Sequence, residues 1–250
     1  MKKVEQLVFL HIQRRNNMKH IIILFVFSCI LLLFFIYSNA CFAFDQPTHE
    51  KINEEIVSKG YGINLDNRLK AFLNIAGGAN QTFTKGATKK VIDWIKLGGV
   101  EEDNPNLIRN MHHFHDPLKS WDAAGFKELS YSSVVWAQHP HQNYIAFTGD
   151  YCWQDTRGYF YKALTATDEN TRNANYADCF RGLGQQMHLV QDASVPGHVR
   201  NDFHWRYHYE SWVRTMQDEA ERGLNSTFYS FIDSSLIKAV KIDRVNPNLR

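Results

Sequence analysis

The stretch Gly182–Trp212, GLGQQMHLVQDASVPGHVRNDFHWRYHYESW, decides both the fold and the chemistry expected of this chain. His188 and Asp192 stand four residues apart in a helical pattern, so both side chains are predicted to point off one helix face. Pro196 ends that helical pattern, and His198 follows six residues after Asp192. One such pair alone is more typical of a solvated surface or of a core histidine.

The same stretch continues with more groups that bind metals, namely His204, His208 and Glu210. These six His, Asp and Glu positions fall within 23 residues, counted from His188 to Glu210. Neutral imidazole and carboxylate are ligands that suit zinc, and i, i+4 spacing is a common way to present them. The stretch predicts a zinc site rather than a bland polar surface.

A second group of acids and histidines lies upstream. Three consecutive acids, Glu101-Glu102-Asp103, precede the segment MHHFHDP at 111–117. An acidic turn is commonly only a turn, whereas three histidines within four residues fit a metal or phosphate site. His49 stands apart from both groups, near the start of the helical pattern over 48–57.

The leader itself reads as an export signal. Ile21–Tyr37 is an almost unbroken apolar run that follows a basic residue and precedes small residues, with the best cleavage site after Ala43. A cut after Ala40, an uncleaved membrane anchor and a lipid-modified Cys41 are the alternatives, and Met18 is a second possible start. We expect 1–43 to be a signal peptide and 44–250 to be exported, to the periplasm or outside the cell.

The remaining pattern is helical. The 250 residues are 44% hydrophobic and 22% charged, which excludes a disordered tail, a collagen-like repeat and a small disulfide scaffold. Alternating strand patterns are nearly absent, and 99–121 is loop-like. We predict one all-α domain of several helices, with helical spacing over 48–57, 66–76, 88–97, 142–164, 175–191, 207–222 and 228–240.

Net charge and cysteines both change once the leader is set aside. Of 28 Lys and Arg and 26 Asp and Glu, five basic residues and one acid lie in 1–43, so the chain's +2 becomes −2 for 44–250. The basic balance therefore indicates no anionic partner. Cys152 and Cys179 remain, either as a disulfide formed in an oxidising compartment or as two buried free thiols.

These motifs resemble a known family, the zinc-dependent bacterial phospholipases C and their relatives, the fungal-type single-strand nucleases. The resemblance rests on the spacing His188-x3-Asp192-x5-His198, on the segment His113-Phe114-His115-Asp116-Pro117, and on Tyr209-Glu210. It extends from Phe44 to Glu210 and implies an all-α, multi-helix domain that holds up to three zinc ions in a cleft.

The resemblance implies a ligand set. One zinc would be bound by His113, His188 and Asp192, with Asp192 bridging to a second ion. Another would be bound by His198, a later histidine and a carboxylate, for which the candidates are His204 or His208 and Glu210. The last would take His49 with the amine and carbonyl of Phe44, because the nucleases place a histidine five residues after their N-terminus.

The family also has an upstream acid, which the resemblance places within Glu101-Glu102-Asp103. Asp103 is favoured as metal ligand and as the group that orients or deprotonates the attacking water, with Glu102 as the alternative. The implied activity is a zinc-dependent phosphodiesterase, first a phospholipase C that hydrolyses glycerophospholipids. Such an enzyme would be a monomer that meets a membrane surface transiently.

Two other functions stay open. A nuclease of the same superfamily would bind single-stranded nucleic acid, and Trp121, Tyr131 and Trp136 would then stack on bases or, in a phospholipase, meet lipid, unless they belong to the core. The other alternative is a zinc-binding helical protein without turnover. The head group that a phospholipase would prefer is not predicted.

Overall fold

A computed structural model describes residues 46–59, 64–105, 108–202 and 209–224 of the chain. The predicted signal peptide at 1–43 and the helix predicted over 228–240 lie outside the described residues. Within the compact unit Phe42–Arg250, the described helices are α2 (Gln46–Lys59), α3 (Leu65–Leu73), α4 (Val91–Glu101), α5 (Ser133–Trp136), α6 (Gln142–Ala146), α7 (Trp153–Thr165), α8 (Glu169–Asp192), α9 (Pro196–Val199) and α10 (Tyr209–Glu221). Short 3-10 turns cover Gly78–Asn80, Asn110–His112 and Phe126–Glu128, and two strands form β1 (Thr82–Lys85) and β2 (Ala87–Lys90).

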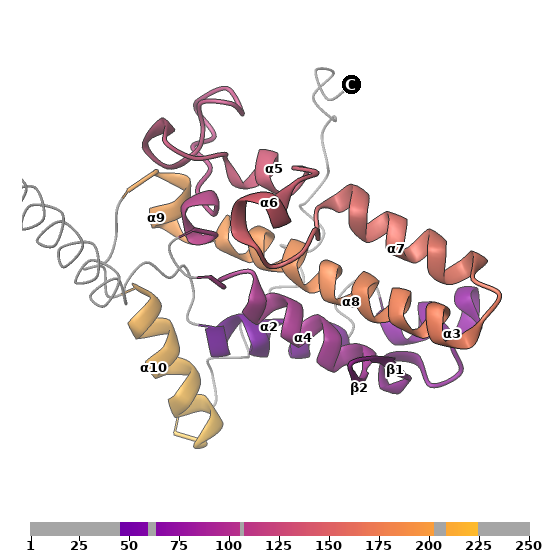
Figure 1. The fold of residues 1–250 in the computed structure, drawn as a ribbon. Helices are drawn as coiled ribbons and strands as arrows, with labels where there is room; N and C mark the ends of the chain where they lie inside the picture. The colour runs from indigo at the N-terminus through magenta and orange to yellow at the C-terminus, as the bar shows by residue number, and fades with distance from the viewer. Residues whose placement is uncertain (1–45, 60–63, 106–107, 203–208, 225–250) are drawn as a thin grey trace, which may run out of the picture. The chain divides into compact units, whose positions relative to one another are not determined.

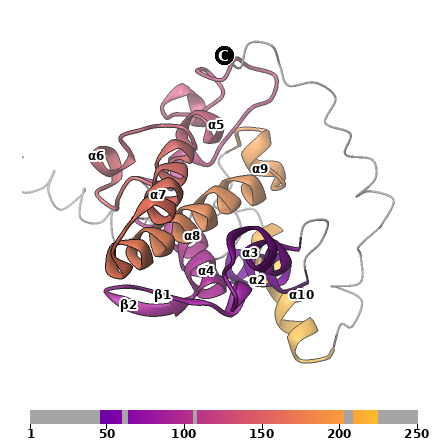
Figure 2. The ribbon, with the colours of Figure 1, turned by 90° about the vertical axis from the view of Figure 1, so that its right-hand side faces the viewer.

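Helix α8 is the axis of the fold. It runs between α4 on one side and α7 on the other, with α2 packed against α4 (Figure 1). The β-hairpin and α3 lie near the N-terminal end of α8 (Figure 1), and the view in Figure 2 shows α9 following its C-terminal end. The main core lies where α4, α8 and the hairpin meet, and includes Val91, Ile95, Phe83 and Phe180. The mostly helical structure agrees with the predicted all-α class.

Two glycine contacts let α4 and α8 cross closely. A Cβ on Gly184 of α8 would lie 2.0 Å from the Ile95 carbonyl oxygen, and a Cβ on Gly98 of α4 would lie 1.9 Å from the Arg181 carbonyl oxygen. The sequence predicts that the helix over 88–97 ends at the glycine pair 98–99, but α4 continues through both to Glu101. The prediction was wrong because these glycines serve contact between helices rather than helix termination.

Replacing Gly184 by alanine is therefore expected to destabilise the protein although alanine favours helix. The added methyl group must displace backbone of α4, which costs about 1–3 kcal/mol of unfolding free energy. The matched control is Gly158→Ala within α7, where nothing lies within 4 Å of the added Cβ and a gain of about 1 kcal/mol follows from helix propensity. Urea unfolding measures both, and equal effects of the two variants would contradict the close crossing.

The hairpin was missed by sequence patterning. Strand β1 pairs antiparallel with β2, and Thr88, expected in a helix, pairs with Thr84. Only Phe83 of β1 is buried, so the two strands carry no alternation of apolar and polar residues. The turn at Gly86 has a φ of 69°, which glycine adopts without strain.

The long helix predicted over 142–164 is divided. Helix α6 ends at Ala146 and is followed by Phe147, whose φ of 58° is left-handed, and α7 begins after Cys152. Between them Gly149 has a φ of 104°. Each helix buries apolar residues of its own, such as Ala146 in α6 and Ala163 in α7. The helical spacing of apolar residues in the sequence therefore does not reveal the break.

Smaller differences concern helix ends. Thr48 lies within α2 rather than capping it, since the helix already includes Gln46. Helix α3 ends at Leu73, with Asn74 in the left-handed conformation, and does not reach the glycines at 77–78. Helix α8 begins at Glu169, six residues before the predicted start, where the Asp168 side chain accepts a hydrogen bond from the Thr171 amide. None of the described helices is long and apolar enough to span a bilayer.

The two cysteines of the described domain, Cys152 and Cys179, are buried free thiols, the second of the two predicted states. Burial raises the pKa of Cys152 to about 11, with the Asp155 carboxylate adding to the effect, and burial raises the pKa of Cys179 to about 12. We expect both thiols to react with an aromatic disulfide reagent at pH 8 at least about 100-fold more slowly in the folded protein than after unfolding. Failure of the unfolded, unreduced protein to react would instead show a disulfide.

Candidate metal centre

Four separate segments deliver five side chains to one buried position. Helix α8 presents His188 and Asp192 from one face, as their spacing predicts. Helix α2 supplies His49, the segment after α4 supplies Asp103, and the residue after the 3-10 turn at 110–112 supplies His113. All five side chains are at most 1% exposed. No contiguous stretch of sequence brings these groups together, so the centre is a product of the tertiary fold.

Asp192 is the hub of the cluster. Its Oδ2 lies 2.7 Å from His113 Nδ1 and 3.3 Å from His188 Nε2, and its Oδ1 lies 3.2 Å from His49 Nε2. His198, at the end of the short helix α9, adds its Nδ1 at 3.6 Å from Asp192 Oδ2. Four imidazoles thus surround one carboxylate.

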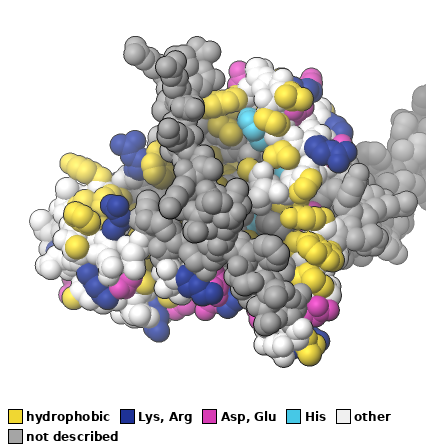
Figure 3. Space-filling model, turned by 180° about the vertical axis from the view of Figure 1, so that it is seen from behind, with side chains coloured by type: hydrophobic (Ala, Val, Ile, Leu, Met, Phe, Trp, Pro, Cys, Tyr) yellow, Lys and Arg dark blue, Asp and Glu magenta, His cyan; other side chains and the backbone are white. Residues whose placement is uncertain are grey.

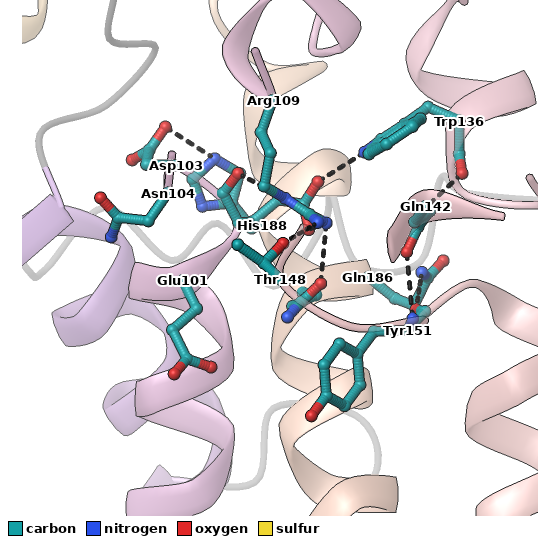
Figure 4. Close-up of polar contacts among 12 residues, drawn as sticks. Glu101, Asp103, Asn104, Arg109, Trp136, Gln142, Thr148, Tyr151, Gln186 and His188 are labelled. Carbon is teal, nitrogen blue, oxygen red and sulfur yellow. Dashed lines mark hydrogen bonds and ion pairs between the residues drawn. The ribbon is translucent and has the colours of Figure 1, made fainter. Parts of the chain in front are cut away.

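Asp103, which follows α4, contacts two of the same histidines. Its Oδ1 lies 3.6 Å from His188 Nε2, the contact drawn in Figure 4, and 3.8 Å from His113 Nδ1. Neither oxygen of Asp103 and neither oxygen of Asp192 makes a hydrogen bond, although all four atoms are buried. Buried carboxylates are normally paired or bind a metal, so these four oxygen atoms are candidate ligands for a cation.

The geometry of the ligand atoms agrees with that reading. Two groups of three side chains each have their ligand atoms within 4.8 Å of one another: His49, Asp103 and His188 form one, and His113, His188 and Asp192 form the other. These groups can hold a metal ion. The second group is the set that the family resemblance implies for one zinc.

Two of the histidines are fixed in orientation by backbone carbonyls. His188 Nδ1 lies 2.6 Å from the Gly99 carbonyl oxygen, and His198 Nδ1 lies 3.1 Å from the His113 carbonyl oxygen. A carbonyl only accepts, so each Nδ1 carries a proton and Nε2 of a neutral ring is left with the lone pair. For His188 that lone pair points at Asp103 and Asp192, which is the arrangement metal-ligating histidines usually show.

Burial and mutual charge shift the pKa values of the acids and histidines of the centre. Burial raises the pKa of Asp103 to about 7 despite the nearby histidines. Burial opposes ionisation of Asp192 too, but His188, His198 and His113 hold its pKa well below the usual range. Burial lowers the pKa of His113, yet Asp192, Glu102 and Asp103 raise it to about 10. Metal binding at such a centre is expected to release protons.

The three upstream acids have three different environments. Glu101 forms an ion pair with the half-buried Arg181. Glu102 is fully buried and paired with Arg109, and it also accepts a hydrogen bond of 2.7 Å from Trp136 Nε1. Glu102 Oε1 also lies 3.7 Å from His113 Nε2, but Asp103 alone of the three has both carboxylate oxygens without a hydrogen bond. The structure therefore favours Asp103, as the resemblance does, and gives Glu102 a different task.

That task is to hold Arg109, a residue that sequence reasoning missed. The Arg109 guanidinium donates to the Glu102 carboxylate and backbone carbonyl, to Thr148 Oγ1 and to Gln185 Oε1 (Figure 4). Burial raises the pKa of Glu102, but the positive charge of Arg109 outweighs this and lowers it to about 2. A buried pair of this kind locks the segment that carries Asp103 against α8.

The other predicted residues are placed as follows. His112 stacks on Trp136 at 4.3 Å between ring centroids, and His115 is only half-buried. Glu210, in the first turn of α10, lines a cavity of about 170 Å³ together with Val195 and Arg200 of the α9 segment. Phe44, His204 and His208 lie outside the described residues.

Of the aromatic residues considered for substrate stacking, Trp136 belongs to the core and Tyr131 is 42% exposed. On the face shown in Figure 3, apolar side chains gather around a recess in which histidine is visible.

Comparisons with protein-family models, with curated proteins and with solved structures gave no significant match. The case for a function therefore rests on the geometry of the centre and on the motifs of the sequence.

Proposed function

We propose that this chain is a zinc-dependent phosphodiesterase, in the first instance a phospholipase C, whose centre is formed by His49, Asp103, His113, His188 and Asp192. The observation that carries the proposal is the convergence of these five buried side chains with four carboxylate oxygens that make no hydrogen bond.

Zinc is the metal that this donor set suits best. Three imidazoles and two carboxylates are a nitrogen-rich set, whereas magnesium and calcium sites are built from oxygen ligands. The centre is also buried, and zinc sites in proteins are commonly enclosed by a hydrophobic shell.

The reaction follows from the motifs rather than from the geometry alone. Zinc lowers the pKa of bound water and offsets the charge that develops on phosphoryl oxygens. Asp103 supplies the carboxylate that accepts the proton of the attacking water, since its oxygens have no competing hydrogen bond. Glu102 is unsuited to this role because Arg109 and Trp136 occupy its carboxylate.

The substrate class is inferred from the sequence motifs. The segment 113–117 and the glutamate at 210 support a glycerophospholipid, which the exported protein would meet at a membrane surface as a monomer. The spacing from Phe44 to His49 supports the alternative, a single-stranded nucleic acid.

The test is a comparison of three substrates with matched metal states. The purified full chain is analysed for zinc content, and hydrolysis of a chromogenic phosphodiester, phosphatidylcholine vesicles and single-stranded DNA is measured before chelation, after chelation and after return of zinc or magnesium. We expect at least one zinc ion per chain. Chelation is expected to stop hydrolysis, and added zinc but not magnesium is expected to restore it.

The possible outcomes separate the candidates. Turnover of DNA but not of vesicles would assign the nuclease activity instead. Bound zinc without turnover of any phosphodiester would leave a non-catalytic zinc protein. Absence of zinc from a folded protein supplied with the metal would overturn the proposed centre itself.

A further inference from the structure

The imidazole of His49 is held differently from those of His188 and His198. The other two rings donate from Nδ1 to backbone carbonyls, which mutation cannot remove. The Nδ1 of His49 instead lies 2.7 Å from Oε1 of Gln191, a side chain on α8 that precedes Asp192. Both His49 and Gln191 are at least nine-tenths buried, so water does not compete for this contact.

The orientation of the Gln191 amide is fixed by a chain of hydrogen bonds that starts at the backbone. The Ile95 carbonyl oxygen only accepts, so it is the Nδ2 of Asn53 that donates to it, at 3.3 Å. Asn53 therefore presents Oδ1 to Gln191, whose Nε2 donates to it at 2.6 Å. With its nitrogen engaged there, Gln191 presents Oε1 to His49, and an amide oxygen also only accepts.

The consequence for His49 is a single neutral tautomer. Nδ1 must carry the proton that Gln191 accepts, which leaves the lone pair on Nε2, 3.2 Å from Asp192 Oδ1. We propose that Gln191, oriented by Asn53, is a positioning residue that fixes His49 in the tautomer able to bind metal through Nε2. This inference rests on the proposed function, because it takes His49 to be a metal ligand.

The packing around Asn53 fixes the position of its side chain. Asn53 is fully buried between α2 and α4, and a Cβ on Gly99 would lie 2.3 Å from its Nδ2. Gly99 therefore leaves the space that Asn53 occupies, and its carbonyl oxygen accepts the hydrogen bond from His188 Nδ1. One glycine of α4 thus supports the orientation of two histidines of the centre.

The first test reads the tautomer directly in metal-free protein. Long-range ¹H–¹⁵N NMR of the chelator-treated full chain at pH 8 distinguishes a proton on Nδ1 from one on Nε2 of His49. We expect the Nδ1–H form in the wild type and a mixture in Gln191→Met, which keeps the side-chain volume but removes the acceptor. Gln191→Glu is expected to retain the Nδ1–H form, because a carboxylate also accepts.

The second test measures zinc affinity by competition with a chromogenic chelator. Loss of an outer-shell partner typically weakens metal binding 10–100-fold, and we expect about this loss in Gln191→Met and near wild-type affinity in Gln191→Glu. The matched control is Gln186→Met, which removes an amide on the same helix whose Nε2 donates to the Tyr151 carbonyl oxygen at 2.9 Å. The control is expected to leave both the tautomer and the affinity unchanged.

The outcomes separate this inference from the proposed function. A wild-type His49 protonated on Nε2 would overturn the inference without any variant having to fold, as would unchanged tautomer and affinity in Gln191→Met. Equal losses in Gln191→Met and Gln191→Glu would indicate a packing role and would also overturn it. Failure of the wild type to bind zinc would overturn the proposed function instead, whatever the NMR result.

Discussion

Asp192→Asn is expected to abolish stable zinc binding and, with it, phosphodiester hydrolysis. Among the described residues, Asp192 is the one carboxylate within 3.6 Å of four imidazoles, so its charge acts on all four of these histidines. Loss of a partner outside the ligand shell already costs 10–100-fold in metal affinity. For a ligand that contacts the whole cluster we expect at least about 1,000-fold, measured as zinc content after dialysis and as the rate on a chromogenic phosphodiester.

The matched control for this variant is Asp178→Asn on the same helix. Asp178 is also buried, but it pairs with Lys85 and accepts a hydrogen bond from the Tyr151 hydroxyl, far along α8 from the cluster. It is expected to keep full zinc content and activity. Equal zinc in the wild type and in Asp192→Asn would refute the assignment of the site.

Arg109→Met is expected to have the largest effect on stability. The variant leaves the fully buried Glu102 carboxylate without its cation, and breaking a buried pair from one side costs about 3–5 kcal/mol. For a domain of this size that corresponds to a fall in Tm of about 10 °C. Thermal and urea unfolding with chelator present measure the loss without a contribution from bound metal.

The effect of Arg109→Met should depend on pH in a defined direction. The pKa of Glu102 is about 2 in the folded protein against an ordinary value of 4.5, so the stabilisation from this pair is complete above about pH 4.5 and is lost as pH falls towards 2. The difference between wild type and variant is therefore expected to shrink on acidification. A difference that stays constant from pH 6 to pH 3 would show that the ion pair is not its cause.

Two further variants check the cause. The double variant Arg109→Met with Glu102→Gln removes both charges and is expected to recover most of the lost stability. Arg181→Met breaks the partly exposed pair with Glu101 and is expected to cost about 1 kcal/mol or less, since exposed pairs contribute little.

Periodicity and spacing were sufficient for part of the fold and of the site. The i, i+4 spacing of His188 and Asp192 places both on one face of α8, because that relation depends only on helix geometry. The clustering of His113 with these two residues agrees with the motif order. Local pattern failed where a residue serves contacts between elements, as at the glycine pair 98–99, which joins α4 to α8 instead of ending α4.

What the sequence by itself determined is which residue types are available and which of them share a helix. It identified His188, Asp192 and His49 as ligands to be considered, and it favoured Asp103 over Glu102 within Glu101-Glu102-Asp103 without a physical reason for the choice. Only the tertiary structure separated those acids, because their roles depend on partners distant in sequence: Arg181 is 80 residues from Glu101, Trp136 is 34 from Glu102, and His188 faces Asp103. The same holds for Gln191, since the orientation of its amide depends on the hydrogen bond to Asn53, 138 residues away.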